Sequence, residues 1–390
     1  CILTILLGLL GSIYCHSSES SSQFHISNSP LSNNIEQPTI TAIFRDNQGL
    51  LWVGTQHGVY RFDGAGTARF SADERGSQWI PASYIKRIAQ TADGHLLLAT
   101  FGGGVLKWSP SELSFKKIRG EAVRKTEYIS ELVVSNNGTI WAGGRNGLFW
   151  TGTSGIPPEN TTLVKYTGIE EVVDVSALMV DNAGNVYVAY GLSLYKIPKA
   201  SNHAEKVVWD DSTISNSDRI TALAENNDEI IYIGTDAGHV VSIDISTGDL
   251  RNHLDLTSES AISVIALLPD EDSLWVATNS GLVHTNDSLS SSYFYQQASS
   301  GLTSDHVTSL YSDNGLIWVG TYQGLNTFSS VPFETYNQQN SGVFDDVLAF
   351  QQDSNKDLWV GTFNGLFRFE AKTGSHTPFS SLSKSGSLID

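Results

Sequence analysis

The sequence predicts an all-β fold: a β-propeller of four-stranded antiparallel blades, with seven blades and the start of a second propeller. Three observations predict it. One motif recurs eight times, at intervals of 41 to 46 residues. Within each repeat, short segments alternate apolar and polar residues, and turns rich in Asn, Asp and Gly separate them, as expected of strands joined by tight hairpins. Helical periodicity is absent from the repeats.

The recurring motif is the second strand of each blade, and it reads LWVGT in its clearest copies, at residues 51–55 and 358–362. Its second residues are 45, 44, 46, 45, 43, 43 and 41 positions apart: Trp52, Leu97, Trp141, Tyr187, Tyr232, Trp275, Trp318 and Trp359. Two residues later every copy has Gly or Ala, which lets neighbouring sheets approach while the large side chain fills the space between them. We therefore expect structural roles for the aromatic set: Trp52, Trp141, Tyr232, Trp275, Trp318 and Trp359.

The elements of a repeat follow in a fixed order, which the first copy illustrates. Residues 40–44 alternate as a first strand, and residues 46–49 supply the Asp, Asn and Gly of a polar turn. The motif strand comes next, then a turn that ends in Gly58 and a third strand at residues 59–62. A less regular fourth strand precedes the following repeat, at residues 68–70 in the first copy and at 333–336 in the seventh.

The ends of the chain suggest a domain organisation. Residues 2–11 are an apolar run of signal-peptide length, too short to span a bilayer, so we assign residues 1–20 to an N-terminally truncated signal peptide. Residues 21–335 are expected to form the seven-bladed propeller. Residues 336–390 are expected to hold the first blade of a second propeller that stops in mid-blade, because residues 385–390 resemble the strand-opening residues 300–305. One eight-bladed ring is the alternative.

Composition and motifs exclude several kinds of function. The net charge is −18, which argues against binding to nucleic acids or anionic lipid surfaces. The two cysteines lie in the first fifteen residues, so no Cys-ligated metal site is expected in the repeats. Residues 353–357 begin like a calcium loop but lack its Gly and its final Glu, and are more simply a hairpin turn. We expect no catalytic residues, no metal and no cofactor.

The full pattern, hydrophobic-Trp-Val-Gly-Thr-x-x-Gly-Leu preceded by Asp-x-x-Gly, resembles the two-component regulator propeller repeat over roughly residues 40–370. The resemblance implies a ligand-sensing, periplasmic, N-terminal part of a hybrid histidine kinase or diguanylate cyclase type receptor. In such receptors two propellers precede a small β-sandwich, a membrane span and a cytoplasmic output domain. By the same resemblance this segment is not an enzyme, the receptor is anchored in the inner membrane by a downstream segment, and a homodimer is expected.

Ligand binding is expected at one end of the ring. There the turns between second and third strands emerge together with the connections into each next first strand, so two loops per blade surround the central channel. The residues at these positions are Gln56, His57, Tyr84, Phe101, Arg145, Asn146, Asp236, Asn279, Asp305, His306, Tyr322 and Gln323. Aromatic rings, amides and one guanidinium suit a neutral or mildly anionic polar ligand, such as an oligosaccharide.

Two functions of other classes stay open at this point. Propellers also carry hydrolases and lyases, so a secreted enzyme acting on polysaccharide is one alternative. A protein-interaction scaffold is the other.

Overall fold

The computed structural model describes residues 24–36, 38–63, 66–73, 79–109, 113–120, 127–152, 162–169, 174–199, 201, 203–209, 213–226, 229–257, 262–329, 347–363, 365–370 and 376–378. The predicted signal peptide and the predicted strand 333–336 lie outside these residues. The chain divides into two compact units, Cys1–Ser330 and Val331–Asp390. The sequence predicted the corresponding boundary at about residue 335.

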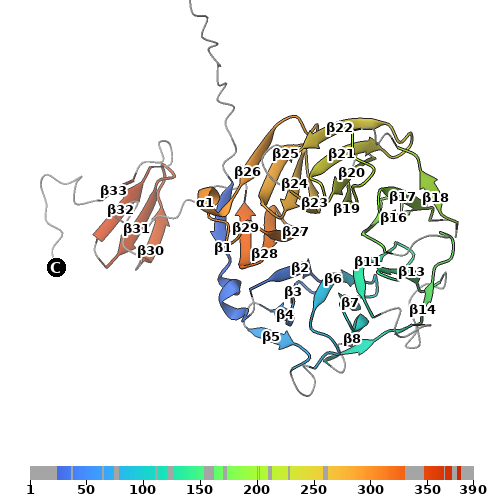
Figure 1. Ribbon diagram of the computed structural model, residues 1–390. Helices are drawn as coiled ribbons and strands as arrows, with labels where there is room; N and C mark the ends of the chain where they lie inside the picture. The colour runs from blue at the N-terminus through green and yellow to red at the C-terminus, as the bar shows by residue number, and fades with distance from the viewer. Residues whose placement is uncertain are drawn as a thin grey trace, which may run out of the picture. The chain divides into compact units, whose positions relative to one another are not determined.

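The first unit contains seven sheets, which we number blades 1 to 7 in chain order (Figure 1). Blade 1 contains β2 (Ile40–Arg45), β3 (Leu51–Thr55), β4 (Gly58–Phe62) and β5 (Thr67–Phe70), and blade 2 contains β6 (Ile85–Gln90), β7 (Leu96–Thr100), β8 (Gly104–Ser109) and β9 (Ser114–Lys117). Blade 3 contains β11 (Ile129–Val134), β12 (Ile140–Gly144), β13 (Gly147–Trp150) and β14 (Thr162–Lys165). Blade 4 contains β15 (Ala177–Val180), β16 (Val186–Tyr190), β17 (Ser193–Ile197) and β18 (Glu205–Val207). In blade 3 a short strand, β10 (Arg119–Gly120), pairs parallel to β14.

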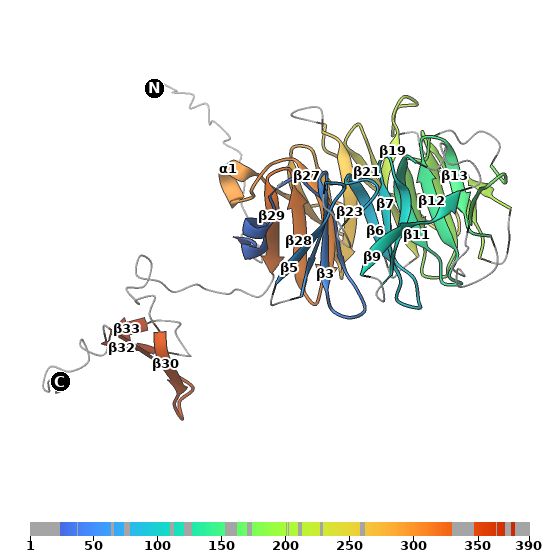
Figure 2. The same cartoon turned by 90° about the horizontal axis from the view of Figure 1, so that it is seen from below.

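Blade 5 contains β19 (Ile220–Glu225), β20 (Ile230–Thr235), β21 (His239–Asp244) and β22 (Leu250–Asp255). Blade 6 contains β23 (Val264–Asp270), β24 (Ser273–Thr278), β25 (Gly281–Asn286) and β26 (Ser292–Tyr295). Blade 7 contains β27 (Val307–Asp313), β28 (Leu316–Thr321), β29 (Gly324–Ser329) and β1 (His25–Asn28). The described residues also include two short helices between strands, the 3-10 helix η1 (Pro30–Asn34) and α1 (Gln297–Ser300). Figure 2 shows the blades side by side in an edge view of this ring.

The second unit contains one further sheet, of β30 (Val347–Gln352), β31 (Leu358–Thr362), β32 (Gly365–Phe369) and β33 (His376–Pro378). Apart from the β10–β14 pair, every paired strand in both units is antiparallel to its neighbour. The predicted all-β fold of four-stranded antiparallel blades is confirmed. Seven sheets form the ring of the first unit and the eighth belongs to the second, so the alternative of one eight-bladed ring does not describe this structure.

The ring is closed by a strand from the N-terminal side of the repeats. β1 pairs antiparallel with β29, with His25 opposite Ser329 and Asn28 opposite Asn326. The Thr308 hydroxyl, on β27, donates a hydrogen bond of 2.5 Å to the carbonyl oxygen of Ile40 on β2. The outer position of blade 7 is therefore filled by β1, whereas the sequence predicted residues 333–336 for it.

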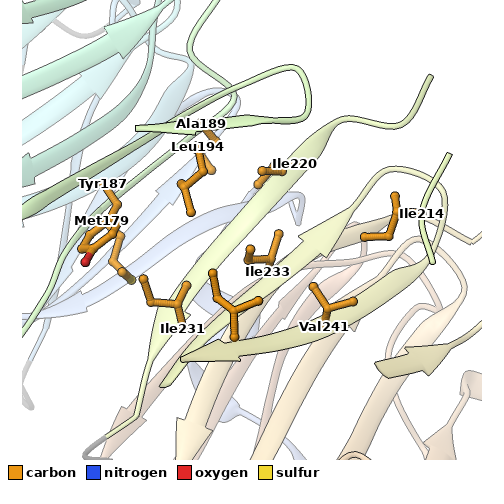
Figure 3. Close-up of a cluster of buried hydrophobic side chains, with 11 residues drawn as sticks. Met179, Tyr187, Ala189, Leu194, Ile214, Ile220, Ile231, Ile233 and Val241 are labelled. Atoms are coloured by element: carbon orange, nitrogen blue, oxygen red, sulfur yellow. The ribbon is translucent and has the colours of Figure 1, made fainter. Parts of the chain in front are cut away.

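Neighbouring blades pack through the small residue of each motif strand. A Cβ atom added at Gly54 would lie 2.8 Å from Ile85 on the next blade, and one at Gly320 would lie 2.6 Å from Ile40. Large side chains fill the remaining space: the interface between blades 4 and 5 contains Tyr187, Ile220 and Ile233 (Figure 3). These interfaces are closely packed, and they provide the rigid scaffold on which the loops are held.

The aromatic residues of the motif are mostly buried. Trp52, Trp141, Tyr232, Trp275 and Trp318 each expose less than a tenth of their surface, and Trp359 is half-buried in the second unit. The Thr that follows the small residue has a different task, because its hydroxyl donates to the carbonyl oxygen of the turn glycine. This bond is 2.9 Å from Thr55 to Gly58 and 3.0 Å from Thr321 to Gly324. The repeat residues thus fix the shape of the second turn, whose tip residues are left free to vary.

Candidate functional site: the mouth of the central channel

A cavity of about 430 Å³ opens at the end of the ring where the sequence predicted the ligand site. All seven blades line it. The second-to-third-strand turns contribute Gln56, Asp236 and Tyr322, and the connections into the first strands contribute Tyr84, Asp174 and His306. We call this cavity the channel mouth. Its volume is typical of a site for a small polar molecule.

The channel mouth continues into a narrower cavity of about 190 Å³ that is enclosed by the seven innermost strands. The two cavities share lining residues, among them Thr41, Arg87 and Glu131. Five blades present a small side chain to the inner cavity at one equivalent position: Ala42, Ala177, Ala222, Ala266 and Ser309. The other two blades have Arg87 and Glu131 at this position.

Arg87 and Glu131 form a two-pronged ion pair across the interface between blades 2 and 3. Arg87 Nη2 lies 2.9 Å from Glu131 Oε1, and Arg87 Nε donates to Glu131 Oε2 at 3.1 Å. Burial raises the pKa of the Glu131 carboxyl, and the neighbouring Arg87 opposes that rise. Two parallel charge-assisted bonds are the geometry in which guanidinium and carboxylate interact most strongly. The pair therefore fixes one polar edge of an otherwise small-residue channel.

Five of the twelve predicted site residues line the channel mouth: Gln56, Tyr84, Asp236, His306 and Tyr322. Of these, His306 and Tyr322 stack with ring centroids 3.8 Å apart and an interplanar angle of 17°. Burial lowers the pKa of His306, which favours its neutral ring. Tyr322 remains 44% exposed, so one face of this stacked pair is available to a ligand.

Phe101 and Arg145 are not lining residues of the cavity, but they lie next to it. The Phe101 ring is 5.9 Å from the ring of Tyr84 and 4.8 Å from that of Tyr128. The Arg145 guanidinium lies over Phe101, 5.2 Å from the ring centroid. Phe101 and Tyr128 both expose more than a third of their surface. The structure therefore shows a second aromatic surface, formed by blades 2 and 3, at the rim of the channel mouth.

The other five predicted residues do not line the cavity: His57, Asn146, Asn279, Asp305 and Gln323. Several instead hold turns in shape. Asn279 Oδ1 accepts from Ser263 N at 2.8 Å, and Asp305 Oδ1 accepts from Gln297 N at 2.6 Å. The backbone N–H groups of His57 and Gln323 donate to the threonines that begin their turns. Position in a turn alone could not separate the residues that line the cavity from those that do not.

Sequence reasoning missed the charged residues of the channel mouth: Lys86, Arg87, Glu131, Asp174 and Arg219. The signal for Arg87 and Glu131 was available, because a comparison of the first strands of the seven repeats finds Ala or Ser in five copies and a charge in two. The ion pair of Arg219 Nη2 with Asp174 Oδ2, at 3.2 Å, gave no such signal.

The charged and aromatic groups of the channel mouth are arranged as follows. Among the residues that the structure describes, no group of three or more His, Cys, Asp or Glu side chains is placed to hold a metal ion. Opposite charges are paired at the channel mouth, and aromatic faces flank it on blades 2, 3 and 7. Within its described part, the chain has no helix of the length and apolarity needed to cross a membrane.

Comparison with solved structures places this fold among known propellers. The chain is similar to the extracellular domains of two B. thetaiotaomicron proteins, a proposed one-component system (19% identity, TM-score 0.63) and a proposed hybrid two-component system (19% identity, TM-score 0.62). Each similarity covers 91% of this chain, and 48% and 49% of those chains. The chain thus spans about half the length of these structures.

A lyase has the same architecture. Virginiamycin B lyase from Staphylococcus aureus is 10% identical with a TM-score of 0.62, over 79% of this chain and 99% of the lyase. At such identities the likeness concerns the fold alone. No curated protein sequence matches the chain.

A sequence-family profile described as the two component regulator propeller matches residues 34–57 and 341–364. Both matches cover the turn and motif strand that recur in the other repeats, one in each structural unit. Two of the repeats thus match the model of the two component regulator propeller, and the fold they build is that of the extracellular domains described above.

Proposed function

We propose that this chain is the periplasmic ligand-sensing part of a bacterial signal-transduction receptor, and that it binds a polar small molecule, an oligosaccharide, at the channel mouth. The observation that carries the proposal is the pairing of exposed aromatic faces with a polar cavity. Tyr322 stacked on His306 and Phe101 packed on Tyr128 present ring faces at the rim, and sugar rings stack on such faces. Gln56 and Asp236 supply hydrogen-bonding groups inside.

The signalling half of the proposal rests on the family and on the extracellular domains that share the fold. In this proposal the bound state of the propeller is passed to a downstream histidine kinase or diguanylate cyclase domain. The gene around this segment tests that half. A membrane span and a kinase or cyclase domain downstream are expected, whereas a stop codon directly after the propeller units would contradict it.

Glycan binding is tested with the whole chain on an array of oligosaccharides, followed by calorimetric titration of the best binder. We expect Tyr322→Ala and Phe101→Ala each to weaken binding by about tenfold, the effect of losing roughly 1.4 kcal/mol of stacking. Tyr293→Ala is the matched control, because Tyr293 is similarly exposed (52%) but lies on β26, the outermost strand of blade 6.

Two results would count against the proposal. Equal affinities of wild type, Tyr322→Ala and Phe101→Ala would remove the channel mouth as the binding site. Release of shortened glycan products during the titration would instead favour the polysaccharide-degrading alternative.

A further inference from the structure

Cations are scarce in this chain, and six arginines of its described part are paired with carboxylates. The sequence has 23 Lys and Arg against 41 Asp and Glu. The arginines that pair with a carboxylate in the described part of the chain are Arg45, Arg69, Arg87, Arg219, Arg251 and Arg368. Arg61 and Arg145 instead lie over the rings of Trp52 and Phe101, and of these two Arg145 is the exposed one. Because carboxylates are in excess, an arginine at the rim of a cavity is expected to pair with one of them. The Arg145 guanidinium instead lies on an aromatic ring.

Lys86 is the second cation at this place. Its Nζ atom lies 5.1 Å from the ring centroid of Tyr84, and the side chain lines the channel mouth. The rings beneath the two cations are themselves neighbours, since Tyr84 and Phe101 are 5.9 Å apart. Lys86 and Arg145 therefore flank one aromatic surface, made of Tyr84, Phe101 and Tyr128.

The position of Lys86 has a structural use in other blades. The equivalent residues Thr41, Thr221 and Thr308 donate hydroxyl hydrogen bonds to the first strand of the next blade, at 2.7, 2.6 and 2.5 Å. The remaining equivalents are Ser130, Ser176 and Ile265, so Lys86 is the only charged residue at this position of the ring. A lysine at this position does not make the hydroxyl hydrogen bond between blades that the threonines make. It places an ammonium group at the channel mouth instead, and packing does not explain why a cation stands there.

Three carboxylates that line the channel mouth, Glu131, Asp174 and Asp236, accept hydrogen bonds from arginines other than Arg145. Glu131 is held by both prongs of Arg87. Asp174 pairs with Arg219, and Asp236 Oδ1 accepts from the backbone N–H of the same arginine at 2.8 Å. Burial and the positive charge of Arg87 lower the pKa of Lys86, and the Glu131 carboxylate opposes that shift, as a bound anion also would. Lys86 and Arg145 are thus two cations on blades 2 and 3 that contact aromatic rings, and neither forms an ion pair among the described residues.

We propose that Lys86 and Arg145 bind the carboxylate or sulfate group of an acidic oligosaccharide whose sugar ring rests on Phe101 and Tyr128. This inference rests on the proposed function and narrows its ligand class to anionic glycans. Both anions offer the oxygen acceptors that ammonium and guanidinium groups bind through charge-assisted hydrogen bonds. The two anions are distinguished by the probes below.

The test uses three oligosaccharides of equal length: an oligogalacturonate for the carboxylate, a sulfated chondroitin fragment for the sulfate, and a cello-oligosaccharide as the neutral member. We expect one acidic probe to bind more weakly as salt is added. The double variant Lys86→Met/Arg145→Met should weaken that binding by about a hundredfold, roughly tenfold for each charge-assisted contact. Lys86→Arg should retain most of it, and Lys206→Met, at an exposed lysine of β18, is the control.

Selenate alone provides a readout that is independent of any sugar. In crystals of the protein soaked with selenate, anomalous density is expected between Lys86 and Arg145 and absent in the double variant. Selenate binding without binding of any glycan would support the anion subsite and contradict the oligosaccharide. Binding of the neutral probe alone, unchanged in the double variant and without selenate density, would overturn the subsite while the proposed function stands.

Discussion

The Oδ2 atom of Asp46 accepts a hydrogen bond from Nε1 of Trp52 at 2.8 Å. Its Oδ1 atom accepts from the N–H groups of Gln48 and Leu50. Asp353 and Trp359 repeat the arrangement in the second unit, with a bond of 3.0 Å. The Asp and the Trp of these repeats are six residues apart. The Asp carboxylate therefore both closes the first turn and accepts the hydrogen bond of the indole N–H.

Removing this carboxylate should destabilise the ring. We expect Asp46→Ala to lower the free energy of unfolding by about 1–3 kcal/mol, because the indole N–H and two turn N–H groups lose their acceptor. Chemical denaturation measures the change. Asp272→Ala, at an exposed turn residue, is the control and should change stability by less than about 0.5 kcal/mol. Equal stability of the two variants would show that water replaces the carboxylate.

Blade 3 offers the reverse experiment. Ser135 occupies the place of Asp46 in an equivalent turn, and Trp141 Nε1 is buried without a hydrogen-bond partner in the described structure. A cavity of about 40 Å³ adjoins both residues. We expect Ser135→Asp to place a carboxylate next to the indole and raise the free energy of unfolding by about 1 kcal/mol. A loss of stability in the same denaturation assay would mean that burying the charge costs more than the new bond contributes.

We expect replacement of both Arg87 and Glu131 to lower the free energy of unfolding less than replacement of Glu131 alone. Glu131→Ala leaves Arg87 without its partner and should cost about 2 kcal/mol, less than for a fully buried pair because the Arg87 side chain is 35% exposed. The double variant Arg87→Ala/Glu131→Ala should recover most of that loss, since five blades have Ala or Ser at this position. A double-mutant cycle gives the coupling, and strictly additive losses would contradict the prediction.

Acid should destabilise the protein through His284. Its ring packs between Trp275, at 4.3 Å, and Phe24, at 4.9 Å, and this burial lowers the pKa of His284 below its ordinary value. The folded protein then binds fewer protons than the unfolded chain, so stability is fully present above about pH 6.5 and is lost as the pH falls through the lowered pKa.

The measurement is the melting temperature from about pH 8 to about pH 5. His284→Phe should flatten the fall in melting temperature, whereas His203→Phe, at an exposed histidine, should leave it unchanged. His253 and His306, whose pKa values are also lowered by burial, will retain part of the fall. A curve for His284→Phe identical to that of wild type would assign the acid sensitivity to those two histidines instead.

The repeat made most of the fold readable from the sequence. Trp52 and Gly54 pack against Ile85 and its neighbours on the next blade. Because every pair of neighbouring blades packs in the same way, each repeat needs residues of similar size at these two positions. β1 escaped prediction for the opposite reason. Its four residues pair with β29, three hundred positions away, and no periodic signal marks them.

The candidate site was harder to read, and its prediction stays untested. Tyr84, Tyr322 and Gln56 were identified because loop position is encoded by the repeat. Whether a turn residue faces the channel depends on local backbone direction, which is why Asn279 and Asp305 serve turns instead. Lys86 and Arg87 lie on a strand where binding residues were not expected, although their departure from the Thr and Ala of other copies marks them.

The pairing of β1 with β29 has a mechanical consequence. The strands are antiparallel, and His25, the first residue of β1, is paired with Ser329, the last residue of β29. The polypeptide therefore enters and leaves the ring at the same end of this strand pair on blade 7. A tension applied between those two points would peel the strands apart one residue pair at a time, instead of shearing them together. Blade 7 would then open first under load, with the six continuous blades still intact.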